Sequence, residues 1–264
     1  MSDPAKWADL KVRVLSGLIV SVLGLAAVVA GGWPLVLLAV AAAGLGLWEL
    51  ARLTAPERPA QALLVGLVAA LSMSVILFEH GPYWLATLAL PSIIGLASPR
   101  KDRLVYAAYG FLIMLAVYAF VAFREGYGLA FAAWLVLVVI ASDILGYFGG
   151  RMIGGPKFWP RVSPKKTWSG TAAGWIGAAV VGLGFAAWFS HPLVLVPFSA
   201  LTAFAAQMGD IGESAIKRRA GVKDSSNLIP GHGGLLDRFD ALIGAAVFVL
   251  VWGLLRLPVP VFEG

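Results

Sequence analysis

Residues 128–149 read GLAFAAWLVLVVIASDILGYFG, and this stretch decides the kind of fold that the chain adopts. Asp143 is its one charged residue, and the run is long enough, as a helix, to cross the hydrocarbon core of a bilayer. A strand is not expected here, because an unclosed sheet edge in lipid leaves backbone groups without hydrogen-bond partners. We therefore predict a membrane-spanning helix over these residues.

Apolar runs of similar length fill most of the chain on both sides of this helix. They predict an all-α, polytopic integral membrane protein with about nine transmembrane helices. Either of the spans 34–52 and 82–97 is also compatible with a re-entrant hairpin, and the first apolar run with a signal peptide. The predicted spans are 14–32, 34–52, 61–78, 82–97, 104–123, 128–149, 169–189, 192–212 and 239–257.

The composition supports the same class. Hydrophobic residues make up 60% of the 264 residues and charged residues 13%, and the mean hydropathy is +0.87. Ordinary soluble domains carry about a quarter charged residues. The chain has no cysteine, which excludes disulfides, a thiolate zinc site and a thiol nucleophile. The net charge is +6, and a membrane protein places such basic residues in its cytoplasmic loops. We therefore expect no nucleic-acid partner.

The basic residues indicate how the chain is oriented. With the N-terminus in the cytoplasm, every Lys and Arg except Arg124 and Arg256 falls in a cytoplasmic segment, as the positive-inside rule requires. We therefore expect a protein of the cytoplasmic (inner) membrane of a bacterium, with its active site facing the cytoplasm. Residues 1–125 are expected to form N-terminal transmembrane helices, and residues 126–264 a C-terminal transmembrane catalytic region.

Two groups in the N-terminal region are interpreted as features of the membrane boundary. Trp48 and Glu49, near the inner end of the second span, are typical of an interfacial anchor and a snorkelling charge, with a catalytic role as the alternative. The basic group Arg100, Lys101 and Arg103 is typical of a topogenic loop, with contact to anionic lipid headgroups as the alternative.

Charged and hydroxyl side chains gather in the C-terminal half. Asp143 lies inside an apolar helix, where a carboxylate is costly without a partner, and is therefore a functional candidate. Tyr147 is one turn further along the same face. The alternative is a structural carboxylate paired with Arg151 or a lysine.

Residues 161–170, RVSPKKTWSG, are expected to be a cytosolic loop that leads into the seventh span. Hydroxyl and ammonium groups immediately before a helix N-terminus suit the oxygens of a phosphate. The alternative is a positive-inside loop with a helix cap, and the glycine spacing of a P-loop is absent. The candidates here are Ser163, Lys165, Lys166 and Thr167.

The cytosolic end of the eighth span carries a second polar group. If the helix continues past the span, four of its residues fall at helical spacing and share one face. Gly221 is expected to end that helix, and Lys223 with Asp224 to open a loop. The four residues are Asp210, Glu213, Ser214 and Lys217.

Further carboxylates follow this loop. Residues 230–234, PGHGG, predict a flexible turn whose backbone amides can approach an anion closely. Asp237 and Asp240 come next, one helical turn apart at the head of the last span. Carboxylates without cysteines or clustered histidines favour a hard cation, so we expect Mg2+ rather than zinc, and the nearby basic groups suit a polyphosphate.

Residues 214–240 resemble the signature of the phosphatidate cytidylyltransferases, also called CDP-diacylglycerol synthases. The resemblance extends to residues 163–167 and 142–151, and so covers roughly the C-terminal half. Ser169 departs from it, since relatives often carry Glu at that position. The signature positions are filled by Ser214, Lys217, Arg218, Lys223, Asp224, Ser226, Pro230, His232, Gly233, Gly234, Asp237, Arg238 and Asp240.

The resemblance implies a reaction of CTP with phosphatidic acid that gives CDP-diacylglycerol and pyrophosphate. It also implies that Asp210 and Asp237 bind Mg2+, with a second, monovalent cation such as K+, and that Asp143, Asp224 and Asp240 are further carboxylates of the site. The catalytic candidates are Asp210, Asp237, Lys217, Arg218, Lys223, Asp224 and Asp240.

Phosphate oxygens need donors, and the basic residues of the same segments can supply them. His232 is expected to shape the loop or contact phosphate rather than act as a base, because a phosphate nucleophile is already anionic. The expected phosphate ligands are Lys166, Lys217, Arg218, Lys223 and Arg238, with hydrogen bonds from Ser163 and Thr167. The other substrate-binding candidates are Lys165, Asp143, Tyr147, Ser214, Gly233 and Gly234.

Two other classes remain as alternatives. One is another CTP-dependent membrane enzyme, such as a polyprenol kinase or an enzyme that cytidylylates an isoprenoid ether lipid. The other is a transporter with Asp143, Asp210 and Asp237 on an ion path, although transporters usually place such charges near the midplane and contain repeats. Membrane lipids are expected partners, and small-residue helix faces suit a homodimer.

Overall fold

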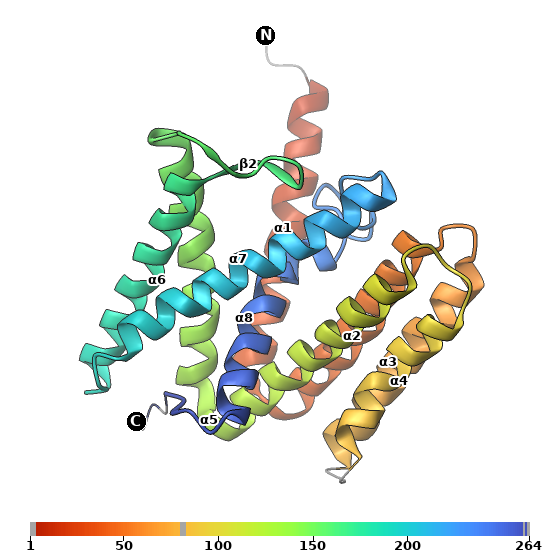
Figure 1. Ribbon diagram of the computed structural model, residues 1–264, viewed down its shortest axis with the longest axis horizontal. Coiled ribbons are helices and arrows are strands. Elements are labelled where there is room, and N and C mark those ends of the chain that lie inside the picture. The colour runs from red at the N-terminus through yellow and green to blue at the C-terminus, as the bar shows by residue number, and fades with distance from the viewer. Residues whose placement is uncertain (1–3, 80–82, 261, 263–264) are drawn as a thin grey trace. The chain divides into compact units, whose positions relative to one another are not determined.

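The computed structural model describes residues 4–79, 83–260 and 262, with side chains from residue 12 onward (Figure 1). Within these residues the chain forms eight helices and one two-stranded hairpin. The elements are α1 (Pro4–Ala30), α2 (Gly32–Thr54), α3 (Pro59–Phe78), α4 (Trp84–Ala97), α5 (Arg103–Met152), β1 (Lys157–Trp159), β2 (Ser163–Thr167), α6 (Trp168–Trp188), α7 (Leu195–Ala220) and α8 (Leu236–Leu254).

Every predicted span overlaps a helix, which confirms the all-α class for the described residues. α5 contains two of the predicted spans, 104–123 and 128–149. It is kinked between them at Gly128, where φ is 83° and ψ is −179°. Glycine adopts a positive φ at little cost because it has no Cβ. The first residue of the predicted span 82–97 lies outside the described residues.

Several of these helices have the dimensions of membrane spans. α4 is apolar but shorter, and it contains Pro91. The chain is therefore a helical protein of the membrane type, while the count of nine spans and the cytoplasmic N-terminus stay predictions. Among the described residues, the segments long and apolar enough to cross a membrane are Val12–Ala30, Gly32–Thr54, Pro59–Phe78, Arg103–Met152 and Trp168–Trp188.

The chain forms two compact units, which are described one at a time. The first comprises Met1–Tyr118 and Arg219–Phe239, and the second comprises Ala119–Arg218 and Asp240–Gly264. The segment 219–239 carries much of the signature, and it belongs to the unit that the N-terminal helices build. The division predicted at residue 125 places this segment in the C-terminal region, and it stays a prediction.

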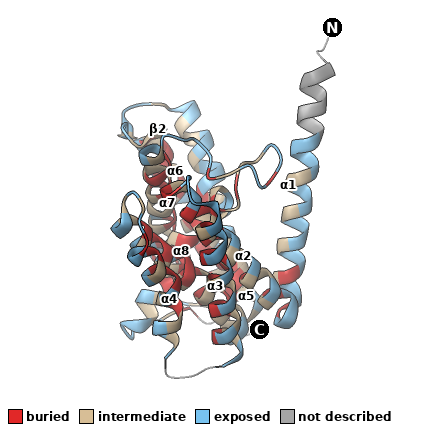
Figure 2. Ribbon diagram, turned by 90° about the vertical axis from the view of Figure 1, so that its right-hand side faces the viewer, coloured by how far each residue is buried: buried red, intermediate tan, exposed pale blue. Residues whose placement is uncertain are grey.

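In the first unit, α2 packs along α3, and α3 packs along α4 (Figure 1). Glycines let α2 and α3 approach, because a Cβ on Gly66 would lie 2.8 Å from the carbonyl oxygen of Gly44. Leu47 and Leu50 of α2 are fully buried. α1 contacts α2, yet most of its apolar residues from Val12 onward are exposed (Figure 2), as expected of a helix that faces lipid.

In the second unit, small residues again let helices come close. A Cβ on Gly170 of α6 would lie 2.5 Å from the carbonyl oxygen of Gly146 and 3.1 Å from the Cα of Gly150, both in α5. Gly209 of α7 meets the backbone of α8 at Gly244 in the same way. These contacts are between backbones, so a side chain at any of these positions would push two helices apart.

The expectation of a plain loop over residues 161–170 is wrong. β1 and β2 form an antiparallel hairpin in which Lys157 pairs with Thr167. The ring of Phe158 packs edge-on against Trp168, with 4.6 Å between centroids, and so fastens the hairpin to the first residue of α6. Strands this short, one of them containing a proline, carry too little periodicity to be recognised from sequence.

We expect Gly170→Ala to lower the stability of the protein in detergent by about 1–3 kcal/mol, because the added methyl group overpacks two backbones. Thermal unfolding followed by size-exclusion chromatography measures this effect. The matched control is Gly184→Ala in the same helix, where an added Cβ meets nothing within 4 Å. There alanine should be neutral or stabilise by up to about 1 kcal/mol. Equal stability of the two variants would contradict the packing described for α5 and α6.

Candidate active site

The C-terminal end of α7 carries the predicted polar face. The helix continues as predicted, and Gly221 follows it with a φ of 76°, so the predicted extension and its end are confirmed. The hydroxyl of Ser214 donates to Oδ1 of Asp210 at 3.3 Å. One turn further on, Nζ of Lys217 lies 2.6 Å from Oε2 of Glu213. Helical spacing alone therefore produces both contacts.

Glu213 and Lys217 form a buried ion pair. Their side chains are 1% and 9% exposed, respectively. Removing one partner from such a pair leaves an uncompensated charge in apolar surroundings, which is strongly destabilising. Arg218, the next residue, is exposed. The ion pair therefore fixes the positions of one ammonium group and one carboxylate near the C-terminal end of α7.

Lys166 brings β2 to α7. Its Nζ lies 2.5 Å from Oδ2 of Asp210 and 3.5 Å from the carbonyl oxygen of Gln207. The two side chains of this ion pair are 26% and 29% exposed, so a polar ligand can reach them. Ser163 and Lys165 lie on the same strand, the first half-buried and the second exposed.

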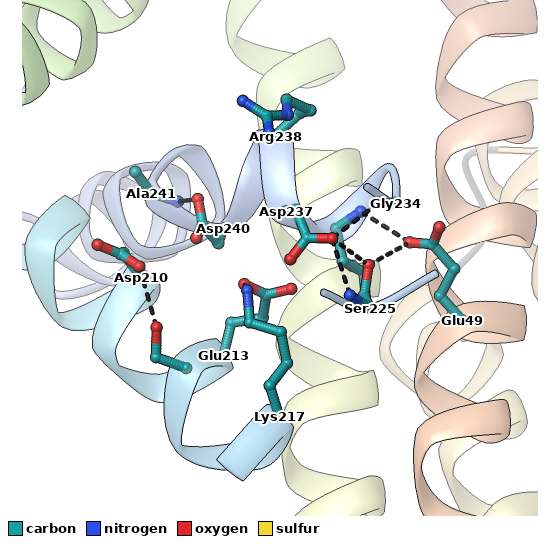
Figure 3. Close-up of polar contacts among 12 residues, drawn as sticks. Glu49, Asp210, Glu213, Lys217, Ser225, Gly234, Asp237, Arg238, Asp240 and Ala241 are labelled. Carbon is teal, nitrogen blue, oxygen red and sulfur yellow. Dashed lines mark hydrogen bonds and ion pairs between the residues drawn. The ribbon is translucent and has the colours of Figure 1, made fainter. Parts of the chain in front are cut away.

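Two further carboxylates lie near Asp210 in the second unit. Asp240 of α8 lies within electrostatic range of Asp210 and Glu213. Asp143 of α5 lies within range of Asp210 and Lys166. We call these six side chains the acidic cluster: Asp143, Lys166, Asp210, Glu213, Lys217 and Asp240, of which Figure 3 labels Asp210, Glu213, Lys217 and Asp240. Its four carboxylates outnumber its two ammonium groups.

Tyr147 has a different neighbour from Asp143. Its hydroxyl accepts a hydrogen bond from the guanidinium of Arg151 at 2.6 Å, and the same guanidinium lies 5.9 Å from the ring centroid. The two residues predicted to share a face therefore have different surroundings. Asp143 belongs to the acidic cluster, whereas Tyr147 pairs with Arg151.

Thr167 is the N-cap of α6. Its Oγ1 accepts a hydrogen bond from the amide of Gly170 at 3.2 Å. Ser169, the departure from the family signature, donates to the carbonyl oxygen of Gly154. Both hydroxyls thus have partners within the protein, and a glutamate at position 169 would lack the hydroxyl that donates to Gly154.

In the first unit, the PGHGG segment forms a tight turn. The amide of Ile229 donates to the carbonyl oxygen of Gly233 at 2.8 Å, and Gly233 has a φ of 83°. Nδ1 of His232 lies 2.9 Å from the hydroxyl of Ser16 in α1. The guanidinium of Arg238 donates twice to the carbonyl oxygen of His232, at 2.6 and 3.1 Å. His232 therefore joins this turn to α1.

Asp237 lies in the first turn of α8 and is held by the preceding loop. Its Oδ2 accepts hydrogen bonds from the amide of Ser225 at 2.8 Å, from the hydroxyl of Ser225 at 2.9 Å and from the amide of Gly234 at 2.8 Å (Figure 3). Three donors on one oxygen fix the orientation of the carboxylate. Lys223 and Asp224, on the same loop, are exposed.

The prediction of a snorkelling charge at Glu49 is wrong. The residue is fully buried, and its carboxylate accepts hydrogen bonds from two serine hydroxyls and two backbone amides of the segment 225–236. The signal that could have found it is the one that singled out Asp143, a carboxylate inside an apolar span. The position of Glu49 near the end of a predicted span favoured the interpretation as a snorkelling charge.

The basic group after α4 contacts protein. Arg100 donates to the hydroxyl of Thr54 at 3.1 Å, and its guanidinium lies 3.9 Å from the ring centroid of Tyr106. Burial lowers the pKa of the Arg100 guanidinium from its ordinary value. Lys101 donates from Nζ to the carbonyl oxygen of Arg219 at 3.2 Å. These contacts tie the start of the segment 219–239 to the helices of the first unit.

The donor set of the acidic cluster fits a hard divalent cation. Within the described residues, no three His, Cys, Asp or Glu side chains form a ready-made metal site. Mg2+ bound with a nucleotide commonly takes only one or two protein carboxylates, and phosphate oxygens and water complete its coordination. The excess of carboxylates over ammonium groups is the charge that such a cation would neutralise.

We expect Thr167→Ala to lower the stability of the protein by about 1 kcal/mol, because the first turn of α6 loses its cap, and Thr167→Ser to retain it. The thermal unfolding midpoint in detergent measures the difference. Thr87→Ala in α4 is the control, since that hydroxyl donates to the carbonyl oxygen of Tyr83, the residue before the helix, and caps no helix. An unchanged midpoint for Thr167→Ala would contradict the capping role.

Comparison with known proteins assigns the chain to a family. The model of the cytidylyltransferase family matches residues 11–255. The phosphatidate cytidylyltransferase of Bacillus subtilis (strain 168) is 30% identical over 91% of this chain and 96% of its own length, and that of Staphylococcus aureus (strain COL) is 30% identical over 89% and 95%. That of Brucella abortus (strain 9-941) is 45% identical over 49% of this chain and 48% of its own. The chain therefore belongs to the cytidylyltransferase family.

Proposed function

We propose that this protein transfers the cytidylyl group of CTP to phosphatidic acid, giving CDP-diacylglycerol and pyrophosphate. The observation that carries the proposal is the acidic cluster, in which a partly exposed ion pair, Lys166 with Asp210, and a buried one, Lys217 with Glu213, lie in an otherwise apolar unit. A metal-bound nucleotide triphosphate needs both kinds of group. The family and the named relatives support the same activity.

The reaction is an in-line displacement at phosphorus. An oxygen of the lipid phosphate forms a bond to the α-phosphorus of CTP, and the bond from that phosphorus to the bridging oxygen breaks and releases pyrophosphate. The nucleophile is already anionic, so no general base is needed. Positioning and charge neutralisation then supply most of the acceleration.

Basic side chains are proposed to hold the phosphates. In the structure, Lys166 pairs with Asp210 and Lys217 with Glu213. Each ammonium group carries three donors and can keep its carboxylate while it donates to a phosphate oxygen. The proposed phosphate ligands are Lys166, Lys217, Arg218, Lys223 and Arg238.

Asp210 and Asp237 are proposed as protein ligands of Mg2+, with a second, monovalent cation such as K+. Bound Mg2+ would neutralise charge on the triphosphate and on the departing pyrophosphate. Contacts within the protein hold both carboxylates in position independently of the metal. Lys166 and Ser214 orient Asp210, and the loop 225–234 orients Asp237.

The orientation in the membrane is also a proposal. Nine spans with a cytoplasmic N-terminus would put the basic loops, the hairpin and the segment 219–239 on the cytoplasmic side, where CTP is found. The distribution of Lys and Arg supports this arrangement. A cytoplasmic-membrane location is also proposed, from the apolar composition. A homodimer is proposed from the small-residue faces of the helices.

The activity is tested with purified protein in detergent. Radiolabel from CTP should enter lipid only when phosphatidic acid and Mg2+ are both present, and EDTA should abolish incorporation, because the metal neutralises the triphosphate. A parallel series offers a polyprenol and an isoprenoid ether lipid. Incorporation into either of these, with none into phosphatidic acid, would contradict the proposed acceptor.

The role of Asp237 is tested by Asp237→Asn. This change removes the metal-binding charge at nearly constant volume, and we expect turnover to fall by about 100-fold or more in a protein that remains folded and membrane-inserted. The matched control is Asp102→Asn, which changes a partly exposed carboxylate 3.7 Å from Arg219. Wild-type turnover in Asp237→Asn would refute the metal assignment.

A further inference from the structure

Glu49 is a charged residue of α2 with no place in the reaction described so far. It is fully buried, although α2 is apolar along most of its length. A buried carboxylate is tolerated only when hydrogen bonds replace its lost hydration. The partners of Glu49 therefore indicate why the residue is there.

Four donors surround the two oxygens of Glu49. Oε1 accepts from the hydroxyl of Ser226 at 2.5 Å and from the amide of Leu235 at 2.9 Å. Oε2 accepts from the amide of Leu236 at 2.8 Å and lies 3.3 Å from the hydroxyl of Ser225. Every donor belongs to the segment that precedes or begins α8, so one side chain of α2 contacts both ends of the segment 225–236.

The two amides give Glu49 the role of a helix cap supplied from another helix. The first N–H groups of a helix have no partner within it, and the helix dipole favours negative charge at that end. Leu235 and Leu236 provide these amides at the beginning of α8. The fit is close, because a Cβ on Gly234 would collide with Oε1 of Glu49.

The same segment holds Asp237. Ser225 lies between the two carboxylates: its amide and hydroxyl donate to Oδ2 of Asp237, and its hydroxyl also lies within reach of Glu49 (Figure 3). Gly234, which donates to Asp237, directly precedes the amides that Glu49 accepts. A shift of Glu49 would therefore move the donors that fix the Asp237 carboxylate.

We propose that Glu49 is a positioning residue for the reaction: it clamps the segment 225–236 and thereby sets the orientation in which Asp237 is presented to the metal-bound substrate. This inference rests on the proposed function only for the identity of the substrate. The clamp itself concerns contacts within the first unit. It assigns a role in the chemistry to an N-terminal helix that lies outside the signature.

Glu49→Gln is the direct test. The amide keeps the size of the side chain but turns one acceptor oxygen into a donor that faces N–H and O–H groups. We expect affinity for Mn2+, measured by electron paramagnetic resonance as a stand-in for Mg2+, and turnover per folded molecule each to fall by about 10-fold or more. Hydrogen exchange of the amides of residues 225–237 should accelerate in the same variant.

Glu57→Gln is the matched control, because that carboxylate is largely exposed in the turn after α2. It should leave Mn2+ affinity, exchange and turnover at wild-type values. If Glu49→Gln does not fold, Ser226→Ala replaces it, since it removes one donor to Glu49 without touching Asp237. That variant should shift the same three readouts in the same direction by a smaller factor.

The results separate the clamp from the proposed function. Lower thermal stability of Glu49→Gln with wild-type Mn2+ affinity and turnover would overturn the inference, because Glu49 would then be structural only. Wild-type protein that makes no CDP-diacylglycerol would overturn the proposed function. Mn2+ affinity and hydrogen exchange would still decide the role of Glu49 in that case.

Discussion

A charge buried among apolar helices needs a partner, and this constraint shapes the part of the molecule that carries chemistry. In the first unit, the carboxylate of Glu49 gathers hydroxyls and amides from the segment that begins α8. In the second, Lys217 pairs with Glu213 and Lys166 with Asp210. The contacts that satisfy these charges also hold the functional side chains in fixed positions, so stability and preorganisation have a common origin.

The two units hold different kinds of candidate groups. The second supplies a concentration of carboxylate and ammonium groups on α5, β2, α7 and α8. The first supplies a loop whose glycine turn and serine donors orient a single carboxylate, Asp237. A nucleotide triphosphate with its metal requires both dense charge and precise orientation. The N-terminal helices therefore support the signature directly, although they lie outside it.

Much of the fold could be predicted from sequence because an apolar run of bilayer length has few structural solutions besides a helix. The polar face of α7 and its end at Gly221 followed from helical spacing and from the tolerance of glycine for a positive φ. The hairpin could not be predicted, because its strands are too short to show a period. The role of Glu49 was missed because its partners lie far along the chain, and local sequence does not record contacts of that kind.

The candidate site was predictable in its residue types but not in its pairings. Lys166 and Asp210 were both candidates, yet only the structure brings them together as an ion pair. Thr167 was expected to bind phosphate or cap a helix, and its hydroxyl is the N-cap of α6.

The central claim, that a cytidylyl group moves from CTP to a lipid phosphate, is tested most directly by following two labels of CTP in one reaction. With phosphatidic acid as acceptor, label on the α-phosphorus should appear in lipid and label on the γ-phosphorus in pyrophosphate. Label from the γ-phosphorus in lipid would show a kinase and contradict the account.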